Sequence, residues 1–206
     1  MRPIQIVTTS FPIADGNYLA ESQTPAGAGF LTLVANTITP PRYVTITSAG
    51  NDTTKNFTIT GVGPNNETQI ETIAGANAGA ATSTKTFAYV ESIYVDAATA
   101  GAVEAGVTQS GYSQWIPMDT YTPNQVTTVS ASVSGTVNYS IEYTNEDPFD
   151  HSFVHQAVPH PAAGGAFTNA STNQTHFTTT LMRALRYKIN SGGGSIRLTI
   201  TQQSTA

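Results

Sequence analysis

The sequence predicts an all-β fold of two small antiparallel β-sandwich domains, Ig-like or jelly-roll-like, preceded by an extended N-terminal arm. Threonine, a residue that favours strands, accounts for about one residue in six. Apolar and polar residues alternate over short segments, as they do in strands with one buried face. Turn signals rich in glycine, proline and asparagine separate these segments about every 8–12 residues, which is typical of sandwiches.

The 206 residues suffice for one large or two small β domains. The expected boundaries are 1–20 for the arm, 21–110 for the first sandwich and 111–206 for the second. Within the arm, Ile4 and Ile6 are the expected apolar anchors. An extended arm of this kind is expected to lie across a neighbouring chain by adding a strand to an exposed sheet edge.

In the first half, the clearest pattern is a pair of alternating segments, 42–48 and 57–61. Residues that tolerate positive φ, Ala-Gly-Asn-Asp, lie between them, so the sequence predicts a β-hairpin here. A longer strand is expected from Thr84 to Val95. Its alternation changes phase near Tyr89, which indicates a bulge or a bend.

In the second half, strands are expected around 115–118, 126–129 and 135–144. Residues 145–176 form a long irregular region, and in a compact domain such a loop is either functional or mobile. Regular alternation returns in 185–189 and 196–200. The glycine-rich segment between them predicts a second hairpin, with three apolar residues of each strand on a shared face.

Composition narrows the choice of partners. Charged residues make up 10% of the chain, against about 25% in typical proteins, and the net charge is −5. We therefore expect no nucleic-acid partner, which would need a basic stripe. Four basic residues lie in the last quarter of the chain: Arg183, Arg186, Lys188 and Arg197. We expect these cations to solvate the polar faces of two strands, and a local basic patch is the alternative.

The chain has no cysteine, so disulfides, thiolate metal sites and thiol nucleophiles are excluded. The N-terminus lacks the apolar run of a signal peptide, and no segment approaches the roughly 18 apolar residues of a membrane span. We expect a protein that is made in a cytoplasm and has no membrane partner.

The irregular region holds most of the reactive side chains. His151 and His155 with nearby carboxylates are a possible metal site, but their spacing favours one only on a helix, and prolines flank this stretch. Asp147 and Asp150 are a possible pair for glycoside hydrolysis, but Asp-Pro also begins ordinary turns. We expect no enzyme activity, no metal and no cofactor.

Three aromatic residues, Tyr112, Trp115 and Tyr121, lie close together in the sequence at the expected domain junction. They have two interpretations. Such rings stack on sugars in lectin-like sites, and they also fill the seam between two domains or between subunits, where a ring and its polar tip both find partners. The second interpretation is favoured.

Several motifs together resemble virion structural proteins of tailed bacteriophages, mainly the short-tailed kinds. In the first half they are Arg42-x-Val-Thr-Ile-Thr-Ser-Ala-Gly-Asn-Asp, Phe57-Thr-Ile-Thr-Gly, Glu71-Thr-Ile-Ala-Gly-Ala-Asn-Ala-Gly and Phe87-x-x-Val-x-Ser-Ile. In the second half they are Gly135-Thr-Val-Asn-Tyr-Ser-Ile-Glu-Tyr-Thr-x-Glu-Asp-Pro and Ala184-Leu-Arg-Tyr-Lys-Ile with Arg197-Leu-Thr-Ile-Thr-Gln. The resemblance covers about two-thirds of the chain and includes no catalytic motif.

The resemblance implies a component of the virion, made in the host cytoplasm. A capsid decoration, or cement, protein is the first expectation, with the major capsid protein and further copies of this chain, a trimer first, as partners. A neck, tail or fibre component, including a module that binds host-surface glycans, is the alternative. The candidate interface residues are Ile4, Ile6, Tyr112, Trp115, Tyr121, Phe149, His151, Phe153 and His155.

Overall fold

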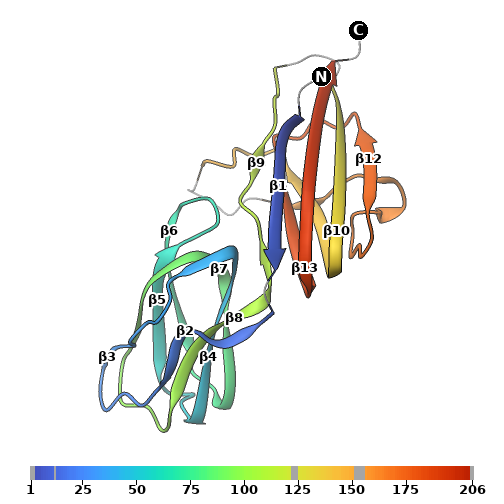
Figure 1. Ribbon diagram of the computed structural model, residues 1–206. Helices are drawn as coiled ribbons and strands as arrows, with labels where there is room; N and C mark the ends of the chain where they lie inside the picture. The colour runs from blue at the N-terminus through green and yellow to red at the C-terminus, as the bar shows by residue number, and fades with distance from the viewer. Residues whose placement is uncertain (1–2, 12, 122–124, 151–155, 205–206) are drawn as a thin grey trace. The chain divides into compact units, whose positions relative to one another are not determined.

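The computed structural model describes residues 3–11, 13–121, 125–150 and 156–204, with the side chains of 3–11 and 204 outside the description. It confirms an all-β protein built from antiparallel strands (Figure 1). The helical structure in the described part is one 3-10 turn, Ala163–Gly165. The chain divides into two compact units: unit 1, Met1–Pro12 with Tyr112–Ala206, and unit 2, Ile13–Gly111.

Unit 2 is built on strands that exchange partners along their length. Strand β7 pairs with β4 through its first part and with β5 through its last part. Strand β8 continues the ladder beyond β4, and β6 lies beyond β5. The strands are β2 (Asp15–Gln23), β3 (Gly29–Phe30), β4 (Thr37–Asn51), β5 (Asn56–Val62), β6 (Thr68–Ala74), β7 (Asn77–Val95) and β8 (Val103–Tyr112).

The irregularity expected near Tyr89 lies at the exchange point in β7. On the β5 side, Thr60 pairs with Ser92 and Gly61 pairs with Val90, so the register shifts at this point. An additional residue in one strand bends it and increases its twist. The phase change in the sequence is therefore the signature of one strand that serves two ladders.

The predicted hairpin between 42–48 and 57–61 is wrong in its pairing. Among the described pairings, β4 is bonded to β7 and β8, whereas β5 is bonded to β6 and β7. The predicted faces are correct, because Val44, Ile46, Phe57 and Ile59 are all buried. The alternation of a strand determines which face is buried, but it does not determine which strand lies alongside.

A buried carboxylate lies where the chain crosses between ladders after β4. Asp52 is fully buried, and its Oδ1 accepts a hydrogen bond of 2.7 Å from the backbone N–H of Ala100. Its own N–H donates to the carbonyl of Ala76, and its carbonyl accepts from the N–H of Lys55. Asp52 thus connects three loops, and this organisation replaces a tight two-strand turn.

Unit 2 has one apolar core, to which both ladders contribute. Its buried members are Leu19, Ala20, Leu31, Ile38, Val44, Ile46, Phe57, Ile59, Phe87, Val90, Ile93, Val95, Val103, Ala105 and Val107. The core also encloses a charged side chain, Arg42, which is 1% exposed. Burial lowers the pKa of Arg42, and its guanidinium faces the ring of Tyr18 at 5.6 Å.

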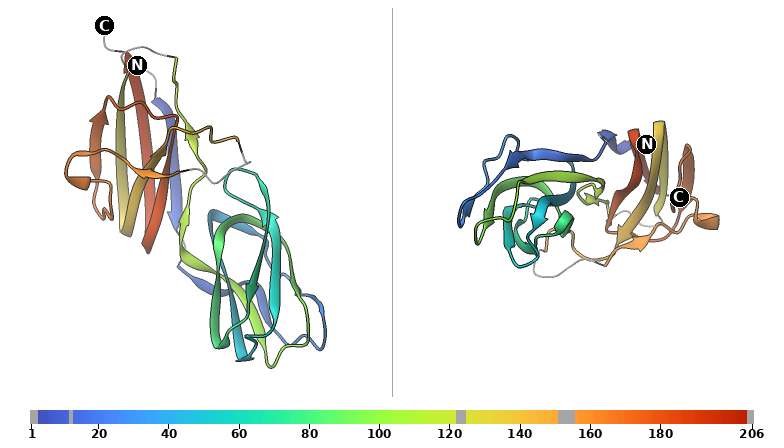
Figure 2. Two further views of the ribbon diagram at one scale, coloured as in Figure 1. Left: turned by 180° about the vertical axis from the view of Figure 1, so that it is seen from behind. Right: turned by 90° about the horizontal axis from the view of Figure 1, so that it is seen from below.

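Unit 1 is organised by two long strands, β10 and β13, which pair side by side along their whole length (Figures 1 and 2). Strands β1 and β9 pair with β13, and β11 and β12 pair with β10. The strands are β1 (Pro3–Phe11), β9 (Ile116–Pro117), β10 (Gln125–Thr144), β11 (Val158–Pro159), β12 (Gln174–Thr178) and β13 (Ala184–Ser204).

Glycines allow this ribbon of two strands to bend in its middle. Gly135 has φ 80° in β10, and Gly192 has φ 98° in β13, where an added Cβ would meet the carbonyl oxygen of Thr136. The second predicted hairpin, across the glycines at 192–194, is therefore wrong, because 184–204 is one continuous strand. Positive φ is the backbone state that glycine adopts readily, and a bend needs it as much as a tight turn does.

Hydrogen bonds show that the ribbon folds back on itself. The N–H of Met118 donates to the carbonyl of Arg183 at 2.9 Å, and the N–H of the next residue, Asp119, donates to Oε1 of Gln202 at 2.8 Å. Positions 183 and 202 lie at opposite ends of β13, so two adjacent residues reach both ends. The two arms of the ribbon enclose a core made by facing halves of the same strands.

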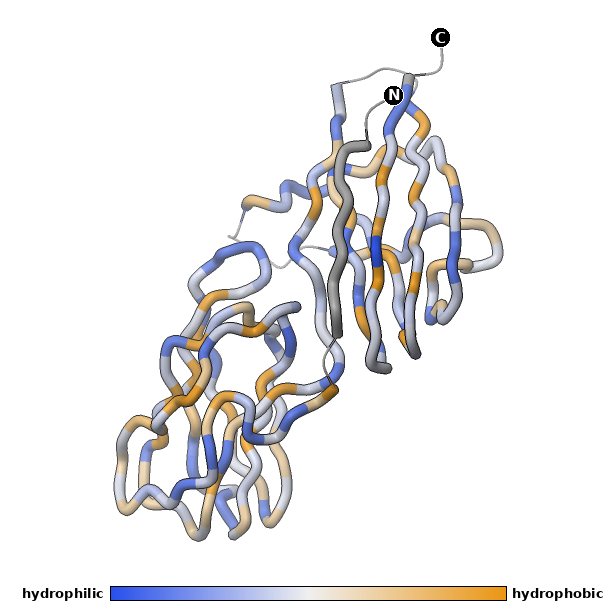
Figure 3. The backbone as a smooth tube through the Cα atoms, viewed as in Figure 1, coloured by the Kyte–Doolittle hydropathy of each residue, from blue (hydrophilic) through white to orange (hydrophobic). Residues whose placement is uncertain are grey.

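The core of unit 1 follows the alternation of the sequence, which is visible along β10 and β13 in Figure 3. Leu185, Tyr187 and Ile189 are buried from one arm of β13, and Ile196, Leu198 and Ile200 from the other, on the shared face that the sequence predicts. The further buried members are Ile116, Met118, Val129, Ala131, Val137, Tyr139, Ile141, Ala162, Phe167, Ala170 and Met182.

The N-terminal arm expected at 1–20 is not confirmed by the described residues of that range. Residues 3–11 form β1, which pairs with β13 of the same chain from Pro3–Thr201 to Phe11–Gly194. Residues 15–23 form β2, which pairs with β8 in unit 2. Ile4 and Ile6 lie within β1, and their side chains are outside the description. The β13 edge of the ribbon thus supplies, within one chain, the partner that a free arm would seek elsewhere.

The glycine bend gives a first prediction. We expect Gly192→Ala to lower the free energy of unfolding of unit 1 by at least about 2 kcal/mol, because a side chain at positive φ is strained and clashes with Thr136. Urea unfolding followed by the fluorescence of Trp115, the single tryptophan, measures it. Gly27→Ala is the control, since its added Cβ meets nothing within 4 Å. Equal stability of the two variants would contradict the role of the bend.

Candidate functional site: the open end of unit 1

The candidate interface residues fall into three groups in the structure. Ile4 and Ile6 belong to β1. His151, Phe153 and His155 lie outside the described residues, and so does the metal site considered for His151 and His155. The four whose side chains are described are Tyr112, Trp115, Tyr121 and Phe149.

Tyr112 and Trp115 form the two sides of a stack around one cation. The guanidinium carbon of Arg186 lies 4.1 Å from the centre of the Tyr112 ring and 4.4 Å from the Trp115 ring. A guanidinium over an aromatic face is attracted by the ring quadrupole. Trp115 is buried and one face of its ring is taken, so a sugar does not stack there. Tyr121, which is almost fully exposed, does not share this buried stack.

Ion pairs hold two of the cations that were considered for a basic patch. Arg186 Nη2 lies 2.7 Å from Oε2 of Glu142, and Arg183 Nη2 lies 2.7 Å from Oδ2 of Asp147. Each paired carboxylate offsets the charge of its arginine. The positive field that a nucleic acid would need is accordingly weakened in unit 1.

The bent ribbon brings several loops together at the end opposite its glycines. We call this surface the open end and define it as residues 119–121, 147–149 and 181–183. Three contacts join these loops to the strand ends: Asp119 with Gln202, Arg183 with the carbonyl of Thr144, and Arg183 with Asp147. The loops therefore share one end of unit 1.

Three large apolar side chains of the open end face solvent. Tyr121 is 96% exposed, Phe149 is 65% exposed and Leu181 is 66% exposed. Exposed apolar side chains mark an interaction site where they form one continuous patch, and singly they are normal. The sequence identifies Tyr121 and Phe149 but not Leu181. The sequence around Leu181 offers one weak sign of its role, a single leucine that follows a run of threonines.

Local hydrogen bonds fix the backbone that presents these rings. Oδ1 of Asp119 accepts from the N–H of Tyr121 at 2.9 Å, and Oδ1 of Asp147 accepts from the N–H of Phe149 at 3.1 Å. Both are turns in which an aspartate bonds to the backbone two residues on. Each of these aspartates is thus engaged in holding a turn, and Asp147 also binds Arg183.

The loop beyond the open end contains a buried histidine, His160. It is 3% exposed, and neither ring nitrogen has a hydrogen-bond partner among the described residues. Its ring meets Phe167 edge to face at 5.0 Å, and Phe167 in turn meets His176 at 5.3 Å. Burial, with a smaller contribution from the charge of His176, lowers the pKa of His160 to about 4.

The two reactive sites considered from the sequence, for a metal and for glycoside hydrolysis, can be compared with the structure. Among the described residues, no group of three or more histidine or acidic side chains is arranged to hold a metal ion. The carboxylate of Asp147, half of the pair considered for glycoside hydrolysis, is occupied by Arg183 and by a turn. The arrangement is suited to contact with another surface through apolar side chains.

Comparison with family models, with curated proteins and with solved structures found no significant match to this chain. In the described part of the chain, no helix has the length and hydropathy needed to cross a bilayer.

The stack around Arg186 gives a second prediction. We expect Arg186→Met to lower the melting temperature of unit 1, at a cost of about 2 kcal/mol, because Glu142 loses its partner in a site where both side chains are less than one-fifth exposed. Differential scanning calorimetry measures it. Arg183→Met is the matched control: its ion pair is 49% and 42% exposed, so its loss costs less than about 1 kcal/mol. Equal effects of the two changes would contradict this account.

His160 gives a third prediction. Its pKa is about 4 when folded and near 6.5 when unfolded, so between these pH values the unfolded chain binds a proton that the folded protein does not. Protonation of His160 in the unfolded chain therefore lowers the free energy of unfolding. This effect is absent above about pH 6.5 and grows as the pH falls towards 4. We expect His160→Leu to flatten the fall in unfolding free energy between pH 7 and pH 4.5, measured by urea unfolding. His176→Leu, the control, should keep most of the fall. Parallel curves for wild type and His160→Leu would refute the assignment.

Proposed function

We propose that this protein is a structural component of a tailed-bacteriophage virion. In this proposal it is a capsid decoration protein that binds the outer surface of the shell and stabilises it. The observation that carries the proposal is the open end, where a braced β ribbon presents Tyr121, Phe149 and Leu181 to solvent. The phage-like motifs quoted from the sequence supply the identity of the partner, the major capsid protein.

The size of the open end suits binding to a repeated lattice. Burying three large apolar side chains contributes on the order of 5–9 kcal/mol before the costs of association. Association itself costs roughly 4–15 kcal/mol, so one open end alone binds weakly. A lattice with many equivalent sites and a self-associated protein raise the effective affinity, because each further contact becomes intramolecular.

The remaining parts of the proposal follow from this mechanism. Copies of the chain assemble as closed oligomers, with a trimer first, and bridge neighbouring capsid subunits. Each unit acts as a rigid β-sandwich module of the Ig-like or jelly-roll-like kind. The protein is made in the host cytoplasm and ends in the virion, without enzyme activity. Because the protein binds the assembled shell and not the free capsid subunits, it shifts the assembly equilibrium of the capsid away from disassembly.

A neck, tail or fibre component is the second candidate. It would use the same open end but would occupy few sites around one axis. What favours the decoration protein over a fibre is the sequence, in which we find neither long repeats nor coiled-coil heptads.

The number of copies in purified particles tests the proposal, and it is our fourth prediction. We expect quantitative mass spectrometry against the major capsid protein to give on the order of hundreds of copies, because only the icosahedral shell offers so many equivalent sites. A dozen or so copies would overturn the decoration role in favour of the neck, tail or fibres. Absence from the particle would overturn the structural function altogether.

A further inference from the structure

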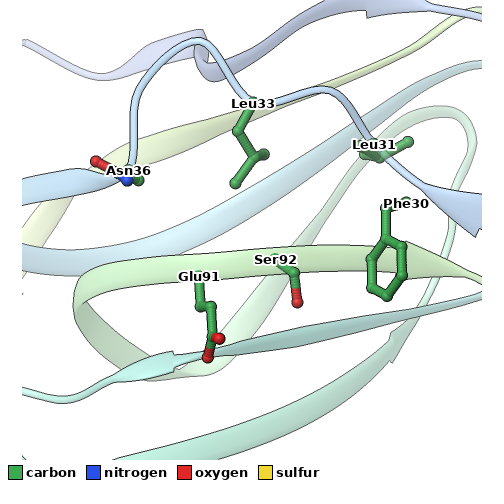
Figure 4. Close-up of a pocket in the computed structure, with 6 residues that line it drawn as sticks. All are labelled: Phe30, Leu31, Leu33, Asn36, Glu91 and Ser92. Carbon is green, nitrogen blue, oxygen red and sulfur yellow. The ribbon is translucent and has the colours of Figure 1, made fainter.

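Unit 2 has an open hollow of about 500 Å³ on its surface, beside the end of β7 (Figure 4). The side chains that line it come from β3 and the segment after it, and from the last part of β7. They are Phe30, Leu31, Leu33, Asn36, Glu91 and Ser92. Its volume lies within the range of small-ligand sites.

Backbone hydrogen bonds hold both sides of the hollow. Segment 31–36 is attached to β7 at two points: the N–H of Leu31 donates to the carbonyl of Ile93, and the N–H of Val90 donates to the carbonyl of Asn36, each at 2.8 Å. Between these points the segment leaves β7, and the register of β7 against β5 shifts there. The hollow is thus a built feature of the exchange point in β7.

One side of the hollow is apolar. The ring of Phe30 is 70% exposed and meets Tyr94 edge to face, with 5.3 Å between ring centres. Leu31 is buried in the core of unit 2, and Leu33 packs against that core. Because Tyr94 braces one edge of the Phe30 ring, a flat aromatic surface is held in place next to the hollow.

The other side of the hollow is polar and carries no positive charge. Within the described part of the chain, no hydrogen bond engages the Glu91 carboxylate or the Ser92 hydroxyl, so both are available to a ligand. Asn36 Nδ2 donates to the Tyr89 hydroxyl at 2.8 Å, and this bond orients the amide. Together these groups offer acceptors and donors opposite an aromatic ring.

We propose that the hollow binds a neutral or amino-sugar glycan. A sugar ring has an apolar C–H face, which suits Phe30, and a rim of hydroxyls, which suits Glu91, Ser92 and Asn36. Since the lining includes a carboxylate but no lysine or arginine, anionic sugars and phosphates are disfavoured. An apolar peptide is also disfavoured, because burying the free carboxylate against it would cost desolvation energy without a partner.

This inference goes beyond the proposed capsid role and does not rest on it. The sugar site that the sequence suggests is at Tyr112, Trp115 and Tyr121. The hollow lies in unit 2 and uses none of these residues. Sugar binding by the purified chain and copy number in particles are separate measurements, so the failure of one leaves the other intact.

Saturation-transfer NMR on the full chain tests the site, as our fifth prediction. The probes are maltotetraose, cellotetraose and tri-N-acetylchitotriose as neutral glycans, a chitosan trimer as an amino sugar, and 3′-sialyllactose as an anion. We expect transfer to at least one neutral or amino-sugar probe and none to sialyllactose. Phe30→Ala should weaken that binding at least tenfold and Glu91→Gln at least threefold. Phe177→Ala, which removes an equally exposed ring from unit 1, should leave it unchanged.

Three outcomes would overturn the inference. The first is no transfer to any neutral or amino-sugar probe. The second is binding that Phe30→Ala and Phe177→Ala weaken equally, since the site would then lie elsewhere. The third is binding of an apolar peptide, such as an acetylated Leu-Phe-Leu amide, more tightly than every sugar and in a manner that depends on Phe30. Because Phe30 is largely exposed, its replacement leaves the fold intact.

Discussion

The bend of the β10–β13 ribbon is the constraint on which the rest of unit 1 depends. Without positive φ at Gly135 and Gly192, the two long strands would run straight and their apolar residues would face water. Because the ribbon folds back, its two arms bury one another, and both ends of β13 reach Met118 and Asp119. The same geometry gathers the loops that form the open end. A local backbone property thereby determines the core and the exposed surface together.

Sequence alternation predicts the class of the fold and the buried faces, but not the strand partners. Val44 and Phe57 are buried as expected, yet they belong to strands that do not pair with each other. In the sequence alone, the glycines at 192–194 predict a hairpin, since a bend and a tight turn need the same backbone freedom. At the open end, Tyr121 and Phe149 were predictable from residue type. The exposure of Leu181 and the hollow beside β7 were not predictable, because both depend on how segments distant in sequence meet.

The two exposed surfaces differ in chemistry, which is why we assign them different partners. The open end presents apolar side chains, two of its charges, Asp147 and Arg183, form an ion pair, and Asp119 is engaged in the turn before Tyr121; such a surface fits another protein. The hollow of unit 2 places one ring opposite free polar groups, which fits a sugar. Each surface is braced by backbone hydrogen bonds, so each is organised before a partner arrives and little conformational entropy is lost on binding.

The central claim is that the open end docks onto the capsid. Co-sedimentation with particles stripped of this protein tests it most directly, by comparing Leu181→Asp with Ile70→Asp, a change at another exposed apolar residue, in unit 2. Our account predicts that Leu181→Asp loses at least tenfold in binding while Ile70→Asp binds as the wild type does, because only the first places a charge in the buried contact. Equal binding of the two variants would contradict it.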